Sequence, residues 1–175
     1  MSYIILVSGA TKSGKSEFAE YLGKKEQNLT YIALSEKRPD DILWQEKILI
    51  HKSRRPKSWN LIETVDLIAY LKNDIGVLLI DSIGGFVVQQ LNENEIIWKK
   101  NLKILLTYLS SYKSKIIIVG EQTGWGLVSE YKIGNLYVER LGMLLKEIAK
   151  ISKENWLTIN GKALNLDNIT FEIPK

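Results

Sequence analysis

Cysteine is absent from this 175-residue chain, and histidine occurs once, at His51. The lack of cysteine excludes disulfides, thiolate zinc sites and cysteine nucleophiles, and it is compatible with a reducing cytoplasm. Any chemistry that requires an imidazole must therefore use His51. Long apolar runs are also missing: no stretch approaches the ~18 residues of a membrane span, and no basic segment followed by an apolar one opens the chain. We expect a soluble cytoplasmic protein with no membrane span.

Charge is balanced closely, with 24 lysines and arginines against 20 aspartates and glutamates and a net charge of +4. The lysines are spread along the chain, which is a weak signal for nucleic-acid binding. A small anionic ligand explains the excess equally well. The length and the ordinary apolar fraction predict one globular domain over residues 1–175.

The segment from Gly9 to Ser16 matches the phosphate-binding pattern G-x4-G-K-[ST] at every position. An apolar run typical of a buried parallel strand, Tyr3–Val7, precedes it, and a helical pattern, Glu17–Lys25, follows it. Because strand, glycine loop and helix come in this order, the segment predicts a nucleotide site. The alternative is an accidental glycine-rich turn.

The spacing of the two glycines, the lysine and the serine suits the binding of phosphate. Glycines let successive N–H groups and the N-terminus of the next helix point at one anion. Lys15 would reach the outer phosphates, and Ser16 would offer its hydroxyl to Mg²⁺. We expect Gly9, Ala10, Thr11, Lys12, Ser13 and Gly14 to hold the phosphates with them.

Strand-like and helix-like segments alternate along the rest of the chain. We expect strands at 29–34, 76–81, 115–119, 156–159 and 163–166, and helices at 42–53, 66–71, 95–112 and 135–150. The last two strands flank an Asn160-Gly161 turn and predict a hairpin. This order predicts an α/β fold, a single RecA-like P-loop domain whose mostly parallel sheet ends in an edge hairpin.

Asp81 ends the clearest buried strand after the first one. Ligands of open parallel sheets bind outside the carboxyl ends of the strands, where this carboxylate would hold Mg²⁺. The alternative role is that of a strand-end turn residue.

A second stretch, His51 to Pro56, carries the histidine beside Lys52, Arg54 and Arg55, and Trp59 and Glu63 follow it. Neutral imidazole is a nucleophile toward phosphorus, and neighbouring cations lower its pKa and neutralise the phosphate. Without further context, such a histidine equally fits a solvated helix end.

The whole pattern resembles the bifunctional adenosylcobinamide kinase/adenosylcobinamide-phosphate guanylyltransferases of cobalamin biosynthesis. The likeness covers nearly the full length. It lies in these segments: the early P-loop, Thr30–Ala33, Asp40-Asp41 with Trp44-Gln45, His51 to Glu63, the strand ending at Asp81, Gly124–Val128, Arg140–Gly142, and Gly161 with Leu164 and Leu166.

The resemblance implies two reactions: phosphorylation of adenosylcobinamide by ATP or GTP, and transfer of GMP from GTP to the product through a His51–GMP intermediate. It also implies a homotrimer with sites between neighbours. Carried over position by position, the nucleotide contacts are these residues: Gly9 to Ser16 including Lys15, Ala33, Leu34, Ser35, Lys52, Ser53, Arg54, Arg55, Glu63 and Asp81.

Three stretches depart from the family's usual pattern. A segment of the type threonine-leucine-tryptophan-valine-serine-asparagine is replaced by Gly84–Gln89, and serine-asparagine-glutamate is replaced by Gly120-Glu121-Gln122. An asparagine-glutamine pair is absent near Leu145-Lys146. The first two lie at strand ends, where we expect corrinoid and metal contacts, so they bear on substrate handling and on the kinase step.

Three alternative functions stay open from the sequence. A small-molecule P-loop kinase would need no covalent nucleotide. A nucleotide-dependent interaction module would contact DNA or a partner through loops at 82–89 and 120–128, but these contain no lysine or arginine to neutralise a nucleic-acid backbone. A degenerate, inactive relative would explain the departures.

Overall fold

The computed structural model describes residues 2–35, 40, 55–126, 128–171 and 173, and its strands form a single sheet. The strands are β1 (Tyr3–Gly9), β2 (Thr30–Leu34), β3 (Asn60–Thr64), β4 (Leu78–Asp81), β5 (Lys115–Glu121), β6 (Glu154–Ile159) and β7 (Lys162–Asn165). They lie in the order β3-β2-β4-β5-β1-β6-β7. Every pairing is parallel except that of β6 with β7. The mostly parallel P-loop fold with an edge hairpin is thus confirmed.

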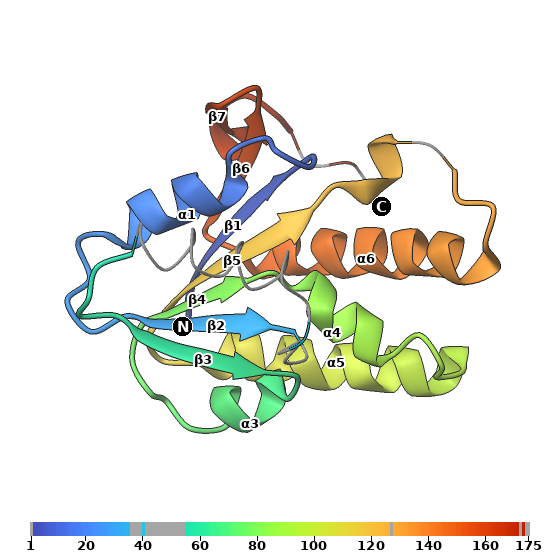
Figure 1. Cartoon of the computed structure of the whole chain (residues 1–175), viewed down its shortest axis with the longest axis horizontal. Helices are drawn as coiled ribbons and strands as arrows, with labels where there is room; N and C mark the ends of the chain where they lie inside the picture. Colours follow the sequence, from blue (N-terminus) through green and yellow to red (C-terminus); the bar gives the residue numbers. More distant parts are fainter. Residues whose placement is uncertain (1, 36–39, 41–54, 127, 172, 174–175) are drawn as a thin grey trace.

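The helices cover both faces of this sheet (Figure 1). They are α1 (Lys15–Gly23), α3 (Leu67–Leu71), α4 (Gly84–Gln89), α5 (Glu95–Ser111) and α6 (Lys132–Ile151), with short 3-10 turns at η1 (Thr123–Trp125) and η2 (Leu166–Asn168). α1 lies on one face, and α4, α5 and α6 lie on the other. Among the described residues, no helix combines the length and the apolarity needed to cross a membrane.

Alternation along β1 explains the two-sided core. Ile4 and Leu6 face the core that α5 and α6 cover, whereas Ile5 and Val7 face the core that α1 covers. Successive side chains of a strand point to opposite faces, and a strand covered on both faces reads as a continuous apolar run. The phosphate loop leaves the sheet at the carboxyl end of this buried strand.

Two elements differ from the sequence predictions. The stretch 82–89 was expected to be a loop, but α4 occupies most of it. Glycine disfavours helix, yet a Cβ on Gly85 would overlap the Leu34 carbonyl oxygen, and Phe86 and Val87 are buried in the core. Tertiary packing thus overrides propensity here. β3 was not predicted, and it forms because it pairs with all of β2. The helix expected at 42–53 lies outside the described residues.

Arg140, on α6, stabilises the connection between α4 and α5. Its side chain is buried, and its guanidinium donates hydrogen bonds to the carbonyl oxygens of Gln90 and Glu93, the latter at 2.7 Å. The guanidinium carbon also lies 5.2 Å from the ring centroid of Trp98. These charged donors add to the backbone bonds of the turn, which include one from Glu93 N to Gln90 O, and the contact with Trp98 adds a cation–π attraction.

We expect Arg140→Ala to lower the free energy of unfolding by about 2–4 kcal/mol, because two carbonyls lose a charged donor. Urea or thermal unfolding followed by circular dichroism measures this loss. Lys132→Ala, which removes an exposed cation from the same helix, is the matched control. Equal stability of the two variants would contradict the role of Arg140 in stabilising the connection between α4 and α5.

Candidate functional site

The phosphate loop lies between β1 and α1, in the order that the sequence predicts. Gly14 adopts a left-handed conformation with φ of +97° at the N-terminus of α1, a conformation that glycine adopts at little cost. The Gly14 carbonyl accepts a hydrogen bond from Phe18 N at 2.9 Å, which starts the helix. The backbone of the loop therefore lies at the N-terminal end of α1, where the binding of anions is favoured.

The β6–β7 hairpin supports this loop from the side. Ser13 Oγ lies 2.8 Å from Thr158 Oγ1 on β6, and Gly161 N donates to Ser13 O at 3.2 Å. A Cβ on Gly9 would overlap the backbone oxygen of Thr158. The sequence predicted the hairpin, but it gave no sign that the hairpin holds the phosphate loop.

Lys15 is buried at the start of α1, and its Nζ donates a hydrogen bond to Ala10 O at 2.6 Å. Burial lowers the pKa of Lys15, because the charged form loses solvent. The carboxylates of Glu121 and Asp81 act in the opposite direction, Glu121 more strongly. An ammonium group held among carboxylates beneath a phosphate loop is placed to meet phosphate oxygens.

Asp81 lies at the carboxyl end of β4, as predicted, and it is held by an aromatic hydroxyl. Tyr31 OH donates to Asp81 Oδ2 at 2.6 Å, and burial followed by the Asp81 charge raises the pKa of Tyr31 well above its usual value. The Arg55 guanidinium carbon lies 3.4 Å from the centroid of the Tyr31 ring, and Arg55 Nε is 3.4 Å from Glu20 Oε1. Arg55, a predicted nucleotide contact, is therefore linked to the strand that supports Asp81.

Ser16 and Asp81 offer a hydroxyl and a carboxylate, the oxygen donors that Mg²⁺ prefers. Within the described ranges, no group of three or more histidine, cysteine, aspartate or glutamate side chains is arranged to hold a metal. A Mg²⁺ ion bound to nucleotide needs few protein ligands, because phosphates and water supply the others. The donor set therefore fits a nucleotide-bound Mg²⁺.

The predicted contacts on β2 and β3 lie side by side. Ala33 pairs with Glu63 in the parallel ladder, and Ser35 N donates to Ala33 O at 3.1 Å. The Leu34 side chain is buried in the core, so any contact with a nucleotide would have to come from its backbone. His51, Lys52, Ser53 and Arg54 lie outside the described residues.

Sequence reasoning missed Glu121, the last residue of β5, as a member of this site. Ser82 Oγ donates a hydrogen bond to Glu121 Oε1, while Glu121 Oε2 is buried and has no hydrogen-bond partner among the described residues. Burial raises the pKa of Glu121. The signal was present, because an acidic residue closely follows an apolar strand here, just as Asp81 does.

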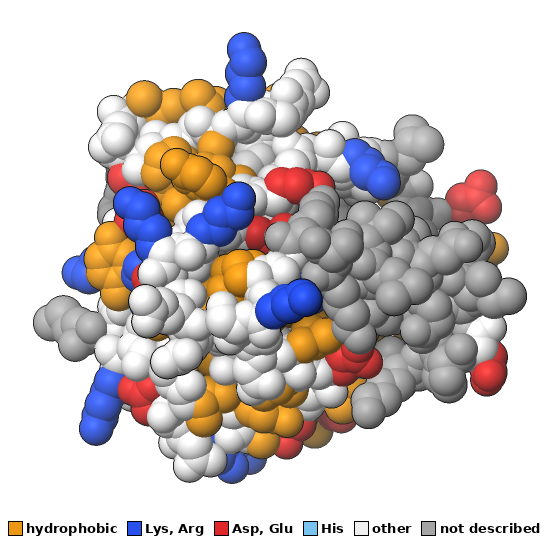
Figure 2. Space-filling view, turned by 60° about the vertical axis from the view of Figure 1, so that its left-hand side comes forward, with side chains coloured by type: hydrophobic (Ala, Val, Ile, Leu, Met, Phe, Trp, Pro, Cys, Tyr) orange, Lys and Arg blue, Asp and Glu red, His pale blue; other side chains and the backbone are white. Residues whose placement is uncertain are grey.

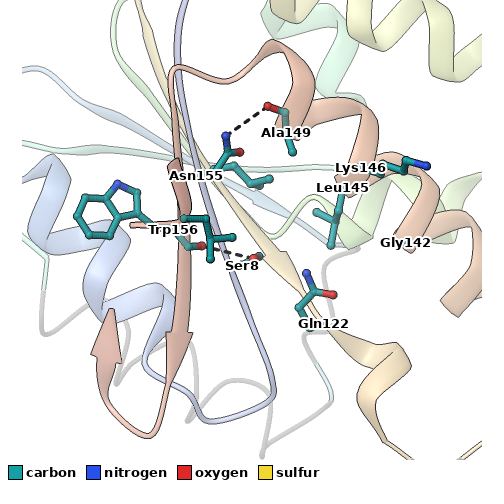
Figure 3. A pocket seen from close by; sticks show the side chains of 10 residues that line it. Ser8, Gln122, Gly142, Leu145, Lys146, Ala149, Asn155 and Trp156 are labelled. Carbon is teal, nitrogen blue, oxygen red and sulfur yellow. Dashed lines mark hydrogen bonds between the residues drawn. The ribbon is translucent and has the colours of Figure 1, made fainter. Parts of the chain in front are cut away.

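A cavity of about 220 Å³ lies on the face of the sheet opposite to α1, between α6 and the strands β1 and β6 (Figure 3). Ser8 Oγ donates to Trp156 O at 3.4 Å, and Asn155 Nδ2 donates to Ala149 O at 3.4 Å. The indole of Trp156 points away from the cavity, toward Phe18 of α1. Because neither Lys15 nor Asp81 lines it, this cavity is separate from the phosphate site.

Figure 2 shows lysine and arginine side chains scattered over the visible face rather than gathered in one patch. The described residues of α4 and of the stretch after β5 carry no cation either. A nucleic-acid partner would need such charges. The absence of a nucleic-acid partner stays a prediction.

A family model described as cobinamide kinase/cobinamide phosphate guanyltransferase matches residues 5–166. The chain belongs to this family. The match spans the phosphate loop, Asp81, Glu121 and the supporting hairpin. The predicted family and the predicted enzyme class, a kinase and guanylyltransferase of cobalamin biosynthesis, are confirmed.

Relatives agree with this assignment over nearly their whole length. The bifunctional adenosylcobalamin biosynthesis protein CobU of Escherichia coli K12 is 24% identical, over 90% of this chain and 96% of its own. The protein of the same name from Salmonella typhimurium is 28% identical with the same coverage. CobP of Pseudomonas aeruginosa is 26% identical over 92% and 95%.

Solved structures show a looser likeness. The flagellar accessory protein FlaH from Methanocaldococcus jannaschii is 15% identical, covers 94% of this chain and 76% of its own, and gives a TM-score of 0.48. The KaiC-like protein PH0186 from Pyrococcus horikoshii is 18% identical, covers 89% and 71%, and gives a TM-score of 0.45. The fold assignment rests on the strand order itself.

The raised pKa of Glu121 generates a prediction about stability. Its pKa is higher in the folded chain than the usual value of 4.5, so protonation favours the folded state. The stability that Glu121 contributes is therefore full below the unfolded pKa and is lost as the pH rises through the folded pKa. Glu121→Gln has no charge to desolvate, and we expect it to be more stable than the parent at pH 7.

The expected rise in Tm is about 2–4 °C, which corresponds to roughly 1 kcal/mol for a chain of this length. The difference should shrink as the pH falls toward 4, where the parent carboxyl is protonated. Thermal unfolding at a series of pH values measures both effects. Glu139→Gln, which neutralises an exposed carboxylate on α6, is the control, and a lower Tm for Glu121→Gln at pH 7 would contradict the desolvation argument.

Proposed function

We propose that this protein phosphorylates the aminopropanol hydroxyl of adenosylcobinamide with ATP or GTP, and then transfers GMP from GTP to adenosylcobinamide phosphate. The product is adenosylcobinamide-GDP. The observation that carries the proposal is the buried Lys15 ammonium beside Asp81 and beneath a phosphate loop, in a chain of the cobinamide kinase family.

In the kinase step, the residues of the phosphate loop position the nucleotide and neutralise charge on it. Backbone N–H groups from Gly9 to Ser16 bind the phosphates, and Lys15 offsets the charge that spreads over the transferred phosphoryl oxygens. Ser16 and Asp81 would hold Mg²⁺, which supplies charge neutralisation between the phosphates when bound. Catalysis in this step is mostly positioning and electrostatics, so no covalent enzyme intermediate is needed.

The guanylyl step uses His51 as the nucleophile. Neutral imidazole attacks the α-phosphorus of GTP, pyrophosphate leaves, and the phosphate of the second substrate then displaces the histidine. The stacking of Arg55 on the ring of Tyr31, whose hydroxyl donates to Asp81, supports this role. Four residues of chain span at most about 14 Å, a length that supports the proposal that His51 reaches the nucleotide edge.

Lys52, Ser53, Arg54 and Arg55 would neutralise the phosphates that His51 approaches, and Ala33, Leu34, Ser35 and Glu63 would contact the nucleoside. The pairing of Ala33 with Glu63 on neighbouring strands supports a joint contact. The homotrimer that the resemblance implies and the cytoplasmic location expected from the sequence stay predictions.

We expect Lys15→Ala to lower the rates of both half-reactions by at least about 10²–10³-fold, because the outer phosphates lose their buried cation. Steady-state assays of phosphoryl and of guanylyl transfer measure the two rates separately. Lys25→Ala, an exposed lysine beyond the end of α1, is the matched control. Near-normal turnover of Lys15→Ala would contradict the assignment of the phosphate loop.

Protein incubated with GTP labelled at the α-phosphorus should become covalently labelled. A phosphorus–nitrogen bond at imidazole breaks in acid, where the protonated ring leaves more easily, and persists in alkali. The label should therefore survive denaturation at high pH and disappear on mild acid treatment. Since His51 is the only histidine, His51→Ala should lose the label completely while still phosphorylating adenosylcobinamide.

Two outcomes would redirect the proposal. Label that resists acid, or that persists in His51→Ala, would point to another nucleophile. An unlabelled parent that still phosphorylates the corrinoid would be a small-molecule kinase without guanylyltransferase activity.

A further inference from the structure

Four large apolar side chains are exposed on the short segment that follows β5. Trp125 is 58% exposed, Val128 83%, Tyr131 73% and Ile133 54%. We call the described residues 123–126 and 128–133 the post-β5 segment. Large apolar side chains gathered on one exposed segment of a protein mark a candidate binding surface.

Hydrogen bonds hold this segment in place, so the exposure of its side chains does not come from a loose loop. Ser129 N donates to Asn135 Oδ1 at 3.1 Å, and Asn135 Nδ2 donates back to Ser129 O at 3.0 Å. Tyr131 N donates to Ser129 Oγ at 3.2 Å, and Tyr131 O accepts from Gly134 N at 3.0 Å. The backbone is therefore fixed where α6 begins, while the Tyr131 side chain stays in solvent.

The apolar face of α6 continues beyond the sheet, because the first turns of the helix extend past the carboxyl ends of the strands (Figure 1). Leu141 is buried on this face, and Tyr137, one turn earlier, is partly buried. The Tyr137 hydroxyl and Glu121 both lie beside Gly84, at the carboxyl edge. Ile133 lies one further turn back on the same face, since residues four apart in a helix lie one above the other. This face therefore becomes exposed above the edge of the sheet.

The post-β5 segment starts beside the phosphate loop. Gln122 N donates to Gly9 O at 2.8 Å. Trp125 follows three residues later, and three residues of chain span at most about 11 Å. A Cβ on Gly124 would lie 3.4 Å from Val138 Cγ1, so η1 packs against α6. The exposed side chains are therefore close to the place where the outer phosphates of a nucleotide would bind.

The size of a corrinoid favours an open surface of this kind. The cavity beside α6 has a volume of about 220 Å³. Sites for drug-sized ligands have volumes of about 300–1,000 Å³, and a corrinoid is larger than most such ligands. Adenosylcobinamide therefore does not fit this cavity, and it needs an exposed surface from which its hydroxyl can reach the γ-phosphate.

The side chains of the segment also suit a corrin ring. The ring is broad, its faces carry methyl groups and its rim carries amides. Indole and phenol rings pack on apolar faces of this kind, and the phenol hydroxyl can bond to an amide. Adenosylcobinamide has a single positive charge. In the segment, Glu130 and Lys132 balance each other, and Glu121 adds a carboxylate just before it, so charge does not oppose binding.

We propose that the post-β5 segment is the surface that binds the corrin ring of adenosylcobinamide, with Trp125 and Tyr131 as its main contacts. This inference rests on the proposed function. A ring bound there directs its aminopropanol arm toward the phosphates at Lys15. Because adenosylcobinamide and its phosphate contain the same ring, the surface serves both half-reactions, whereas formation of the GMP adduct does not involve it.

Trp125→Ala and Tyr131→Ala test the two main contacts separately. We expect each variant to raise the KM for adenosylcobinamide and for adenosylcobinamide phosphate by about tenfold, because a large aromatic contact is lost. The KM for nucleotide should stay within about twofold of the parent. Covalent labelling by GTP should keep its parent rate. Equilibrium dialysis with adenosylcobinamide, detected by its visible absorbance, should show the same loss of affinity.

Tyr21→Ala is the matched control, because it removes an exposed aromatic side chain from the end of α1 that lies away from the phosphate loop. It should leave every KM unchanged. Trp125→Phe, which keeps an aromatic face, should retain most of the corrinoid affinity. If the Tm of an alanine variant falls, Val128→Lys replaces it: a lysine is tolerated at so exposed a position, and its charge should weaken the binding of the cationic corrinoid.

Four results would overturn the inference. Unchanged corrinoid affinity in both alanine variants would remove the surface and leave the proposed function intact. An equal rise in the KM for nucleotide would assign the segment to the phosphate site. A loss of assembly in these variants, measured by sedimentation equilibrium, would make the segment a contact between copies of this chain. A parent that forms the GMP adduct but does not bind adenosylcobinamide would refute the corrinoid part of the proposed function, and this surface with it.

Discussion

The burial of the Lys15 ammonium beneath the phosphate loop is the constraint on which the carboxyl edge of this sheet depends. An ammonium that has lost water is stable only with nearby negative charge, and Glu121 and Asp81 supply it. These carboxylates in turn need donors of their own, which are Ser82 and Tyr31. The ligand-binding edge is therefore one connected set of polar groups, in which each member compensates the burial of another.

Strand order is what brings these groups together. Lys15, Asp81 and Glu121 are far apart in the sequence, but β1, β5 and β4 are neighbours and run parallel, so their carboxyl ends meet. The apolar layers on both faces pack the sheet against its helices. The edge hairpin adds the last restraint through Ser13 and Thr158. Core and site thus have separate roles within one sheet.

Much of this arrangement could be predicted from the sequence, and what escaped has physical causes. The phosphate loop and Asp81 are encoded locally, because a short motif and an apolar strand place them without reference to distant residues. α4 escaped because its two glycines disfavour helix, and only tertiary contacts explain them: those of Gly85 with Leu34 on β2, and those of Gly84 with Glu121 and Tyr137. From the sequence, Glu121 stands only within a departing stretch at a strand end where corrinoid and metal contacts are expected. Its position near Lys15 depends on strand order, which local patterns do not determine.

The structure shows that the departures from the family's pattern lie in two sets of residues that contact one another, which we call matched sets. A Cβ at residue 120 would overlap Cδ2 of Leu145, so a glycine replaces serine where a leucine occupies the position near which the family has asparagine and glutamine. Likewise, glycine replaces threonine at residue 84 where Glu121 replaces asparagine and Tyr137 fills the adjoining space. Reversion of either glycine alone would create a clash, whereas random decay would produce unmatched changes and cavities. The matched sets therefore favour a repacked, working catalytic edge over an inactive one.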